Sequence, residues 1–469
     1  MPKRNLIWVL ALLAVAALTA WLTRPSPAPN DPLWTHFRSV AEAQRVIREN
    51  YLHAADEDRL RRGAVEGMVR SLDEFSTYVP PEQAEEFHRR IMGQESGPGL
   101  CVSVADGTVR VEGVLPDSPA WRAGIPAGTE ITAIDDKPTA GLSEAQVEKL
   151  LQGRAETELK LSLRRPSGRK DVVTLARRKF PVEAVEGLWR DAAGNWDYQI
   201  EPGSRLAYFR IREFVRQTGD QFQNAYLRAG EPTGVVLDLR GNPGGLLSSG
   251  AAVANLFLRE GRIVTSVSRG GKKEVYDAHA AGTVPETPIV VLVDGDTASA
   301  AEIVAAALKE HGRAVVLGVR TRGKGYIQSV IPLGDDLGLI NLTTSEFYIG
   351  ESQTPITRRA GASRWGVDPH ETVAIPAEVS DRLRALREQA RLLVLPETAP
   401  TTTTAAAADR QRLRLVRELL SLDAQLTWAV QLLHKPEEMQ RICREAELQR
   451  RREARTRAAP PAATKGSHD

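Results

Sequence analysis

The stretch Thr297-Ala298-Ser299-Ala300-Ala301-Glu302 directly follows a strand-like apolar run, Ile289–Val293, and opens an apolar helical segment. Ser299 is therefore expected at a strand-to-helix turn, where backbone N–H groups and the positive end of the helix can stabilise a developing oxyanion. A glycine-flanked lysine, Lys324, follows in the segment Gly323-Lys324-Gly325-Tyr326-Ile327-Gln328. A serine hydroxyl activated by a lysine amine is sufficient for nucleophilic catalysis.

A lysine acts as a general base only when its amine is neutral. At its ordinary pKa of about 10.4 the amine of Lys324 is protonated at neutral pH, and burial would have to lower this pKa to roughly 7–8, a change worth about 4 kcal/mol. Gln328 would share a strand face with Lys324 and could orient the amine without adding charge. The apolar side chains that would surround the lysine are Val315, Val316, Leu317, Val319, Ile327, Val330 and Ile331. An exposed lysine on a hairpin and a serine that only caps a helix fit the same residues, and these two motifs alone favour that structural interpretation.

A third motif reverses this preference. Gly234–Arg240 is typical of a buried strand that ends in charged residues. It runs into the loop Gly241-Asn242-Pro243-Gly244-Gly245, where the backbone can approach a ligand closely. A helix is expected from Leu246 to Leu258, so the motif is a strand–loop–helix unit.

Together the three motifs resemble those of the carboxy-terminal processing (tail-specific) proteases. The family pattern combines a D-L-R-x-N-P-G-G strand and loop, a [ST]-A-S-A-x-E serine segment and a G-K-G-x-[VI]-Q lysine segment. Ser299, Lys324 and Gln328 have the spacing of that pattern. The resemblance covers roughly residues 35–375 and continues more weakly through Asp423-Ala424-Gln425-Leu426. It implies a serine endopeptidase with a Ser-Lys dyad and an inserted PDZ domain.

The resemblance also implies a role for each matching residue. Ser299 would be the nucleophile, Lys324 the general base and acid, and Gln328 the group that orients the lysine. The supporting positions are the candidate oxyanion-hole residues Ala300, Gly244 and Gly245 and the charged residues Asp238, Arg240 and Glu302. An ion-pair network that only braces the turn would explain the three charged residues equally well.

The chain departs from the family pattern at two positions. Arg322 stands where relatives often carry an aromatic residue before the G-K-G segment, which bears on the substrate pockets. Gln152-Gly153-Arg154 stands where relatives often end the PDZ helix in Arg-Gly. The second departure puts in doubt the signalling from PDZ domain to active site that some relatives use.

Other kinds of active site find little support in the sequence. Gly318–Lys324 has the spacing of a phosphate-binding P-loop, but Gly325 occupies the position that needs a hydroxyl for magnesium, and a strand is expected to follow instead of a helix. The eight histidines are scattered, so neither a metal nor a cofactor is expected. A net charge of +2 gives no indication of nucleic-acid binding. Neither Cys101 nor Cys443 has the surroundings of a catalytic cysteine.

The N-terminus indicates export from the cytoplasm. Lys3 and Arg4 precede an almost uninterrupted apolar stretch, residues 5–23, which is long enough to cross a bilayer as a helix. Positive residues on its short side favour an N-terminus-in orientation with the rest of the chain outside. We expect an uncleaved membrane anchor, while a signal peptide cleaved after Leu18-Thr19-Ala20 stays open as the alternative, which would give a secreted form. Either interpretation places the catalytic part in the periplasm or cell envelope.

The pattern along the chain predicts an α/β protease core built on a mixed sheet with crossover helices, a β-rich PDZ domain, and helical segments at both ends. The expected boundaries are a linker over 24–32, an N-terminal helical region over 33–93, the PDZ domain over 96–178 and the protease core over 180–375. A helix over 376–395, a linker over 396–408, a helical region over 409–457 and a disordered tail over 458–469 complete the chain.

Within the predicted PDZ domain, Gly97-Pro98-Gly99-Leu100 is the candidate carboxylate-binding loop. Backbone N–H groups of such a loop receive a peptide C-terminus while the peptide adds a strand to the sheet. A glycine-rich hairpin without a ligand is the structural alternative. The expected substrates are therefore C-terminal tails of proteins or peptides. The N-terminal helix is expected to hold the protein in the membrane, and a homodimer is left open.

Two functions of different classes fit these observations. The first is an exported, membrane-anchored serine endopeptidase that recognises a C-terminal tail and cuts nearby. The second is a PDZ scaffold or peptide-binding chaperone with an inactive protease domain. The complete set of Ser299, Lys324 and Gln328 favours the first, because a decayed enzyme usually loses at least one such group.

Overall fold

The computed structural model describes residues 32–191, 194–200, 203–334, 336–395, 397 and 402–458. The predicted anchor over 5–23, all but the last residue of the 24–32 linker, and the tail beyond residue 458 lie outside these ranges. Within the described ranges, none of the helices combines the length and apolar composition that a bilayer crossing requires. The chain divides into two compact units, residues 1–80 with 332–342 and residues 81–331 with 343–469.

The second unit is built around a mixed six-stranded sheet. Its strand order is β10-β13-β14-β17-β18-β22, and all neighbours are parallel except β10 and β13. The strands are β10 (Val185–Glu186), β13 (Leu206–Ile211), β14 (Gly234–Asp238), β17 (Ile289–Val293), β18 (Val315–Gly318) and β22 (Glu371–Thr372). The predicted α/β class with a mixed sheet and crossover helices is confirmed.

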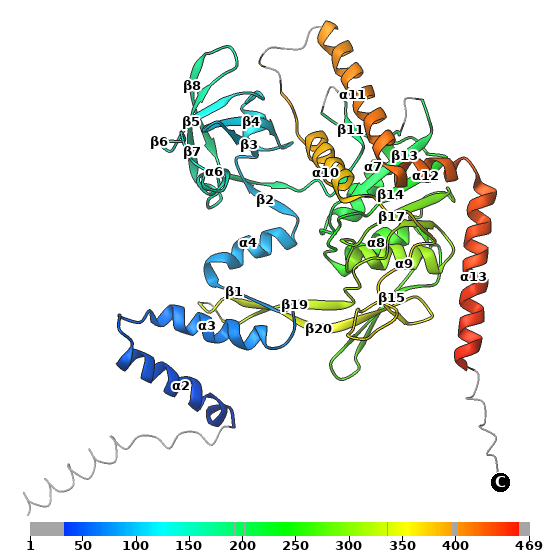
Figure 1. Cartoon of the computed structure of the whole chain (residues 1–469), viewed down its shortest axis with the longest axis horizontal. Coiled ribbons are helices and arrows are strands. Elements are labelled where there is room, and N and C mark those ends of the chain that lie inside the picture. Colours follow the sequence, from blue (N-terminus) through cyan, green and yellow to red (C-terminus); the bar gives the residue numbers. More distant parts are fainter. Residues whose placement is uncertain are drawn as a thin grey trace, which may run out of the picture. The chain divides into compact units, whose positions relative to one another are not determined.

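Helices cover both faces of this sheet because its central strands are apolar on both faces. Val235 and Leu237 of β14 pack on one side, and Val236 between them packs on the other. The first side is covered by α7 (Thr218–Arg228), α8 (Leu247–Phe257) and α9 (Ala300–Glu310). The opposite side is covered by α10 (Ala377–Arg391), α11 (Thr402–Leu422), α12 (Ala424–Leu433) and α13 (Pro436–Ala458). Figure 1 shows α8 and α9 on one side of β14 and β17 and α12 on the other.

Antiparallel strands lie beside this core. β15 (Arg262–Ser268) pairs with β16 (Lys273–Asp277) and with the later part of β20 (Leu339–Ile349), which also pairs with β19 (Tyr326–Pro332) and β21 (Thr354–Pro355). A short pair, β11 (Trp189–Arg190) with β12 (Trp196–Asp197), completes this part.

The predicted PDZ region forms its own sheet and core. Its strand order is β3-β4-β5-β7-β8, with β6 on β5 and with β3 at one end. The elements are β3 (Leu100–Ala105), β4 (Thr108–Val114), α5 (Pro119–Arg122), β5 (Glu130–Ile134), β6 (Lys137–Pro138), α6 (Glu144–Leu151), β7 (Glu158–Arg164) and β8 (Lys170–Ala176). The chain enters and leaves this region through an antiparallel pair of strands, β2 (Gln94–Gly97) and β9 (Arg178–Pro181). Helix α4 (Pro81–Ile91) precedes β2.

The segment after α10 differs from the helix predicted over 376–395. The helix ends at Arg391, and Leu393 forms a backbone bridge with Val114 of β4 through two hydrogen bonds of 3.0 and 3.1 Å. Leu393 is buried in the PDZ core, so this core is completed by a residue far outside the predicted 96–178 boundary. The apolar run Leu392–Leu395 resembles a helical continuation in sequence, whereas burial against β4 draws it into an extended conformation.

One other predicted boundary also moves, and the N-terminal helical region contains a strand. Helix α11 begins at Thr402, inside the segment expected as a linker over 396–408, where the alanines that follow are strong helix formers. In the first unit, α2 (Pro32–Asn50), α3 (Glu57–Arg70) and the short strand β1 (Thr77–Val79) occupy the predicted helical region, and β1 pairs with residues 339–341.

Candidate active site

The three sequence motifs follow three neighbouring parallel strands. The loop 239–245 follows β14, residues 294–299 follow β17, and residues 319–325 follow β18. Because carboxyl ends of parallel strands meet at one edge of a sheet, the motifs gather there although they are far apart in the chain. This edge is the usual place for ligands in open α/β sheets.

Ser299 has a strained backbone at the turn into α9. It is the N-cap residue of that helix, with φ +54° and ψ −120°, a conformation that residues with a side chain rarely adopt. A Cβ placed on Gly244 would lie only 2.6 Å from the Ser299 Cβ and 3.1 Å from the Ala300 nitrogen. Only glycine at 244 therefore lets the loop after β14 lie against the serine turn.

The carboxylate of Glu302 joins the serine turn to the lysine loop. Its Oε2 accepts the backbone N–H groups of Ser299 at 2.8 Å and of Lys324 at 2.9 Å. Its Oε1 accepts the Gly323 N–H at 2.7 Å and the Thr321 hydroxyl. One fully buried side chain thus fixes the backbone of both predicted catalytic residues.

Glu302 acts in these contacts only as an acceptor. Burial raises the pKa of its carboxyl group, while the hydrogen bonds from Thr321, Gly323, Lys324 and Ser299 act in the opposite direction. The Thr321 hydroxyl oxygen also accepts the Val367 N–H, so the hydroxyl hydrogen is directed at Glu302. Four donors facing two oxygens leave no place for a carboxyl proton, which favours the ionised form.

Lys324 lies in a half-buried loop two residues before β19. Burial lowers the pKa of its amine, the positive charge of Arg322 lowers it further, and the charge of Glu302 raises it. This direction is the one that a neutral lysine base requires. Arg322 itself pairs with Asp296 at 2.7 Å, both side chains being exposed.

A shared strand face for Lys324 and Gln328 requires that both lie in one strand, and Lys324 lies outside β19. β19 begins at Tyr326, so the alternation of side chains along a strand does not extend back to Lys324. The Gln328 amide donates to the Thr343 hydroxyl on β20 at 3.2 Å. Its proposed task of orienting the lysine stays a prediction.

The candidate oxyanion-hole residues lie together beside Ser299. The Gly244 N–H already donates to the Asn242 side chain at 2.8 Å, and the Gly244 carbonyl accepts the Phe214 N–H at the same distance. Gly245 has φ +134° and a Cβ there would collide with the Phe214 backbone. The N–H groups of Ala300 and Gly245 are therefore better candidates than that of Gly244.

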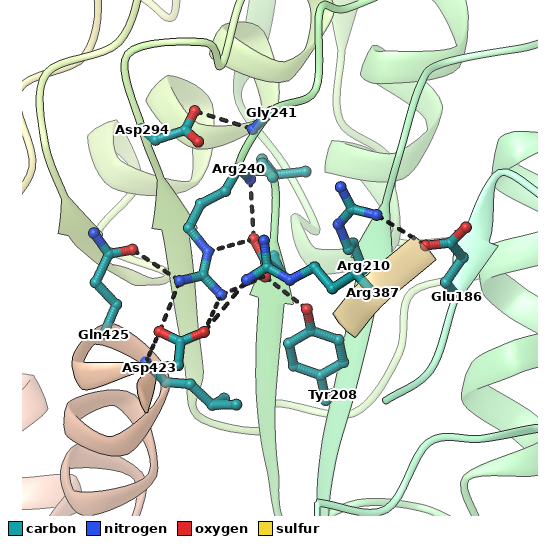
Figure 2. A network of polar contacts seen from close by, with 12 residues as sticks. Glu186, Tyr208, Arg210, Arg240, Gly241, Asp294, Arg387, Asp423 and Gln425 are labelled. Carbon is teal, nitrogen blue, oxygen red and sulfur yellow. Dashed lines mark hydrogen bonds and ion pairs between the residues drawn. The ribbon is translucent and has the colours of Figure 1, made fainter. Parts of the chain in front are cut away.

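Asp238 and Arg240 form an ion pair. Figure 2 shows the Arg240 side chain directed toward Asp423 and Gln425 of the C-terminal helices. Arg240 also pairs with Asp423, the N-cap residue of α12, at 2.7 Å. Coulombic attraction to Arg240 and Arg387 overcomes the effect of burial and lowers the pKa of Asp238. For these two residues the ion-pair network left open by the sequence is present.

Sequence reasoning missed two residues that link the loops of the site, Asp294 and the buried Thr297. The Asp294 carboxylate, directly after β17, accepts the N–H groups of Gly241 at 3.0 Å and Thr297 at 2.9 Å. The Thr297 hydroxyl donates to the Leu239 carbonyl at 2.9 Å. Both residues link the loop after β14 to the serine turn, and a polar residue at the carboxyl end of a parallel strand was the signal available for Asp294.

The PDZ loop Gly97-Pro98-Gly99-Leu100 contacts α5. The Gly99 carbonyl accepts the Leu115 N–H at 2.9 Å, the Pro98 carbonyl accepts the Ala120 N–H at 2.8 Å, and a Cβ on Gly99 would meet Ser118 at 2.1 Å. Proline has no N–H, so the backbone donors that this loop could offer a carboxylate are those of Gly97, Gly99 and Leu100. β3 begins at Leu100, ends the sheet among the described strands and lies beside α6, as strand addition requires.

Three alternatives raised by the sequence concern a metal site, a reactive cysteine and a P-loop. The described part of the chain holds no group of three or more metal-ligating side chains. Burial raises the pKa of the Cys101 thiol to about 11, which keeps it protonated at neutral pH, and both cysteines are free. The P-loop-like segment is followed by strand β19, as expected, and not by a helix.

Comparison with known families agrees with this arrangement. Residues 205–373 match peptidase family S41, residues 110–165 match a PDZ domain, and residues 23–83 match the N-terminal domain of the activating protease CtpB. The first match spans all three loops of the site.

Curated relatives extend over most of the chain. A carboxy-terminal-processing protease of Bartonella bacilliformis is 34% identical over 312 residues, which cover 64% of this chain and 68% of the relative. The carboxy-terminal processing protease CtpA of Bacillus subtilis is 31% identical over 362 residues, covering 75% and 74%. The solved photosystem II D1 C-terminal processing protease has 27% identity, covers 76% of this chain and 98% of its own, and superposes with a TM-score of 0.40. The protein is thus a serine-type peptidase. It belongs to the carboxy-terminal processing proteases of family S41, with a PDZ domain.

Proposed function

We propose that this protein is an exported, membrane-anchored endopeptidase that selects substrates by their C-terminal tails and hydrolyses them with a Ser299–Lys324 dyad. The observation that supports this most directly is the Glu302 carboxylate, which accepts the backbone N–H of Ser299 and that of Lys324 on the same oxygen. A shared acceptor at 2.8 and 2.9 Å places the two backbones side by side. Incubation of the protein with candidate tails, with mass-spectrometric mapping of the products, tests the activity as a whole.

In the proposed acylation step, the neutral Lys324 amine removes the proton from the Ser299 hydroxyl as its oxygen attacks the scissile carbonyl carbon. Charge then develops on the carbonyl oxygen, where the N–H groups of Ala300 and Gly245 would donate to it. As the tetrahedral intermediate collapses, the protonated lysine gives its proton to the leaving amine. Water attacks the acyl-enzyme in the same way, and Ser299 recovers its proton.

The dyad predicts a defined pH dependence. Because burial and Arg322 both lower the Lys324 pKa, kcat should rise with pH through this lowered value and reach a plateau below the ordinary range of lysine. Arg322→Gln should move the midpoint upward, since a positive neighbour is lost, whereas Arg313→Gln, remote from the site, should not. Chelators should have no effect. A flat profile between acidic and alkaline pH would exclude a lysine base.

The PDZ domain is proposed to bind the substrate tail as an added strand along β3, with its carboxylate at the Gly97–Leu100 loop. A free carboxylate accepts charge-assisted hydrogen bonds that an amide cannot reproduce. Amidating the C-terminus of a tail peptide should therefore weaken binding by roughly 1.5–3 kcal/mol, or about 10–150-fold in Kd. Isothermal titration with Ser299→Ala protein measures this without turnover, and equal affinity for both peptides would remove the carboxylate hypothesis.

Gating by the PDZ domain is proposed to be weak, because Gln152 stands where some relatives carry an arginine that couples the two domains. Deleting residues 96–178 would test this poorly, since Leu393 is buried in the PDZ core and would be exposed by the deletion. Gly99→Val is a sharper change, because the added side chain would collide with Ser118 at the loop itself. It should reduce selection of tailed substrates more than turnover of a short unstructured peptide.

Residues 5–23 are proposed to anchor the protein with its catalytic part outside the cytoplasm. The basis is the apolar length and the preceding Lys3 and Arg4. We expect the intact N-terminus in the membrane fraction, resistant to extraction by salt and alkaline carbonate. N-terminal sequencing that begins near residue 21 in a soluble fraction would show signal-peptide cleavage instead. The homodimer stays a prediction, and sedimentation velocity would decide it.

A further inference from the structure

The Arg240 guanidinium is held by acceptors from two parts of the chain, the end of β14 and the start of α12. It bonds Asp238 through Nε at 2.9 Å and Nη2 at 2.6 Å, and Asp423 through Nη1 at 2.8 Å and Nη2 at 2.7 Å. Nη1 also donates to Gln425 at 3.1 Å. All five guanidinium N–H donors are thereby engaged, which fixes the side chain in one orientation.

A second arginine balances the charge of this network. Arg387 of α10 lies 3.3 Å from both Asp238 and Asp423. Figure 2 shows Arg387 beside Arg240 and Asp423. Two carboxylates and two guanidinium groups thus neutralise each other, and Asp238, Arg240 and Asp423 are each at most 3% exposed. Buried charges of this kind are costly unless every partner is present, so the loss of one partner disturbs the others.

The network is continuous with the loop beside the nucleophile. The Arg240 N–H donates to Asp238 at 2.9 Å, which sets the direction in which the chain leaves β14. Two residues later, the Asn242 carbonyl accepts the Ala298 N–H at 2.9 Å, and its side chain accepts the Gly244 N–H. From there Gly244 lies against Ser299.

We propose that Asp423 on the N-cap of α12 and Arg387 on α10 are positioning residues for catalysis. They hold Arg240, and through it the loop 241–245 that shapes the surroundings of Ser299. Both lie beyond residues 205–373, the stretch that matches family S41. The proposal rests on the proposed function, because the placement of this loop affects turnover only if Ser299 is the nucleophile.

The test is Asp423→Asn in the full-length protein. Asparagine can still cap α12 in place of Asp423, whose Oδ1 accepts the Leu426 N–H at 3.0 Å. The substitution removes a charge that the guanidinium groups of Arg240 and Arg387 share. We expect kcat to fall by about tenfold or more while KM changes by less than about threefold. Hydrogen exchange of the amides in 241–245 should become faster. Arg382→Ala is the matched control, since it removes the exposed 2.7 Å pair with Glu418 between α10 and α11 and touches no member of the network.

A charge-compensating double variant distinguishes a positioning role of Asp423 from a simple loss of stability. The double variant Asp423→Asn, Arg387→Gln leaves Asp238 paired with Arg240 and should recover part of the kcat lost in Asp423→Asn. A folded Asp423→Asn protein with the kcat and loop exchange of the control would overturn the proposal. If that variant does not fold, Arg387→Gln, at the partly exposed edge of the network, carries the same exchange test. The hydrogen-exchange result does not depend on which residue is the nucleophile. Activity retained in Ser299→Ala would therefore contradict the proposed function and leave the link between Asp423 and the loop 241–245 standing.

Discussion

Ser299→Ala should abolish peptide cleavage while leaving the fold and the binding of tail peptides intact. The change removes only the hydroxyl oxygen, whereas the strained turn is held by the backbone hydrogen bond to Glu302, which alanine keeps. We expect the turnover of a purified preparation to fall by about 10³-fold or more, measured by mass spectrometry of a tail substrate. Ser329→Ala, which loses a hydroxyl contact to Thr344 on the nearby strand β20, should retain activity.

Lys324→Ala should have an equally large effect, because the serine then lacks its base. Residues that act as a unit give non-additive losses, so the double variant should be no less active than either single variant. Lys309 on α9 supplies the control: burial lowers its pKa as well, but its amine donates to the Asp368 carbonyl, outside the three catalytic loops. Lys309→Met should therefore keep its catalytic rate. Residual turnover near that of the native protein in Ser299→Ala or Lys324→Ala would falsify the dyad.

The elements that carry the site were predictable from local patterns. β17 has the bounds predicted for its strand, and α8 and α9 follow their loops because glycine and small residues end a strand and an apolar helical stripe follows. The gathering of three loops at one sheet edge also followed from the parallel topology. Local periodicity was sufficient because these strands are buried on both faces.

The remaining features depend on contacts between distant parts of the chain. Nothing near Leu393 indicates that it completes the core of a domain that begins almost 300 residues earlier. Asp423 was noticed only as a weak continuation of the family pattern, yet it supplies two acceptors to Arg240. The strand-face argument for Gln328 failed because it assumed where β19 begins, and strand ends are the least certain part of a sequence pattern.

The second large effect on kcat is expected from substitution of Glu302, although its role does not require contact with the substrate. Both of its oxygens accept backbone N–H groups, so in Glu302→Gln the amide NH2 must face N–H donors on one side. Leaving such buried donors without an acceptor should destabilise the fold by about 1–3 kcal/mol. Displacement of the serine and lysine backbones relative to each other should lower kcat by about 10²-fold.

The same substitution changes the pH profile in a direction that a purely structural defect would not produce. The negative charge of Glu302 raises the Lys324 pKa, so its removal should move the rise of kcat to lower pH. Glu310→Gln is the matched control, because Glu310 ends the same helix and accepts a hydrogen bond from Ser352, remote from the dyad. Kinetics should be measured well below the melting temperature of each variant. If kcat falls in Glu302→Gln without this acidic shift, Glu302 acts on the backbone alone. If kcat matches the control, the shared acceptor is not what holds serine and lysine together.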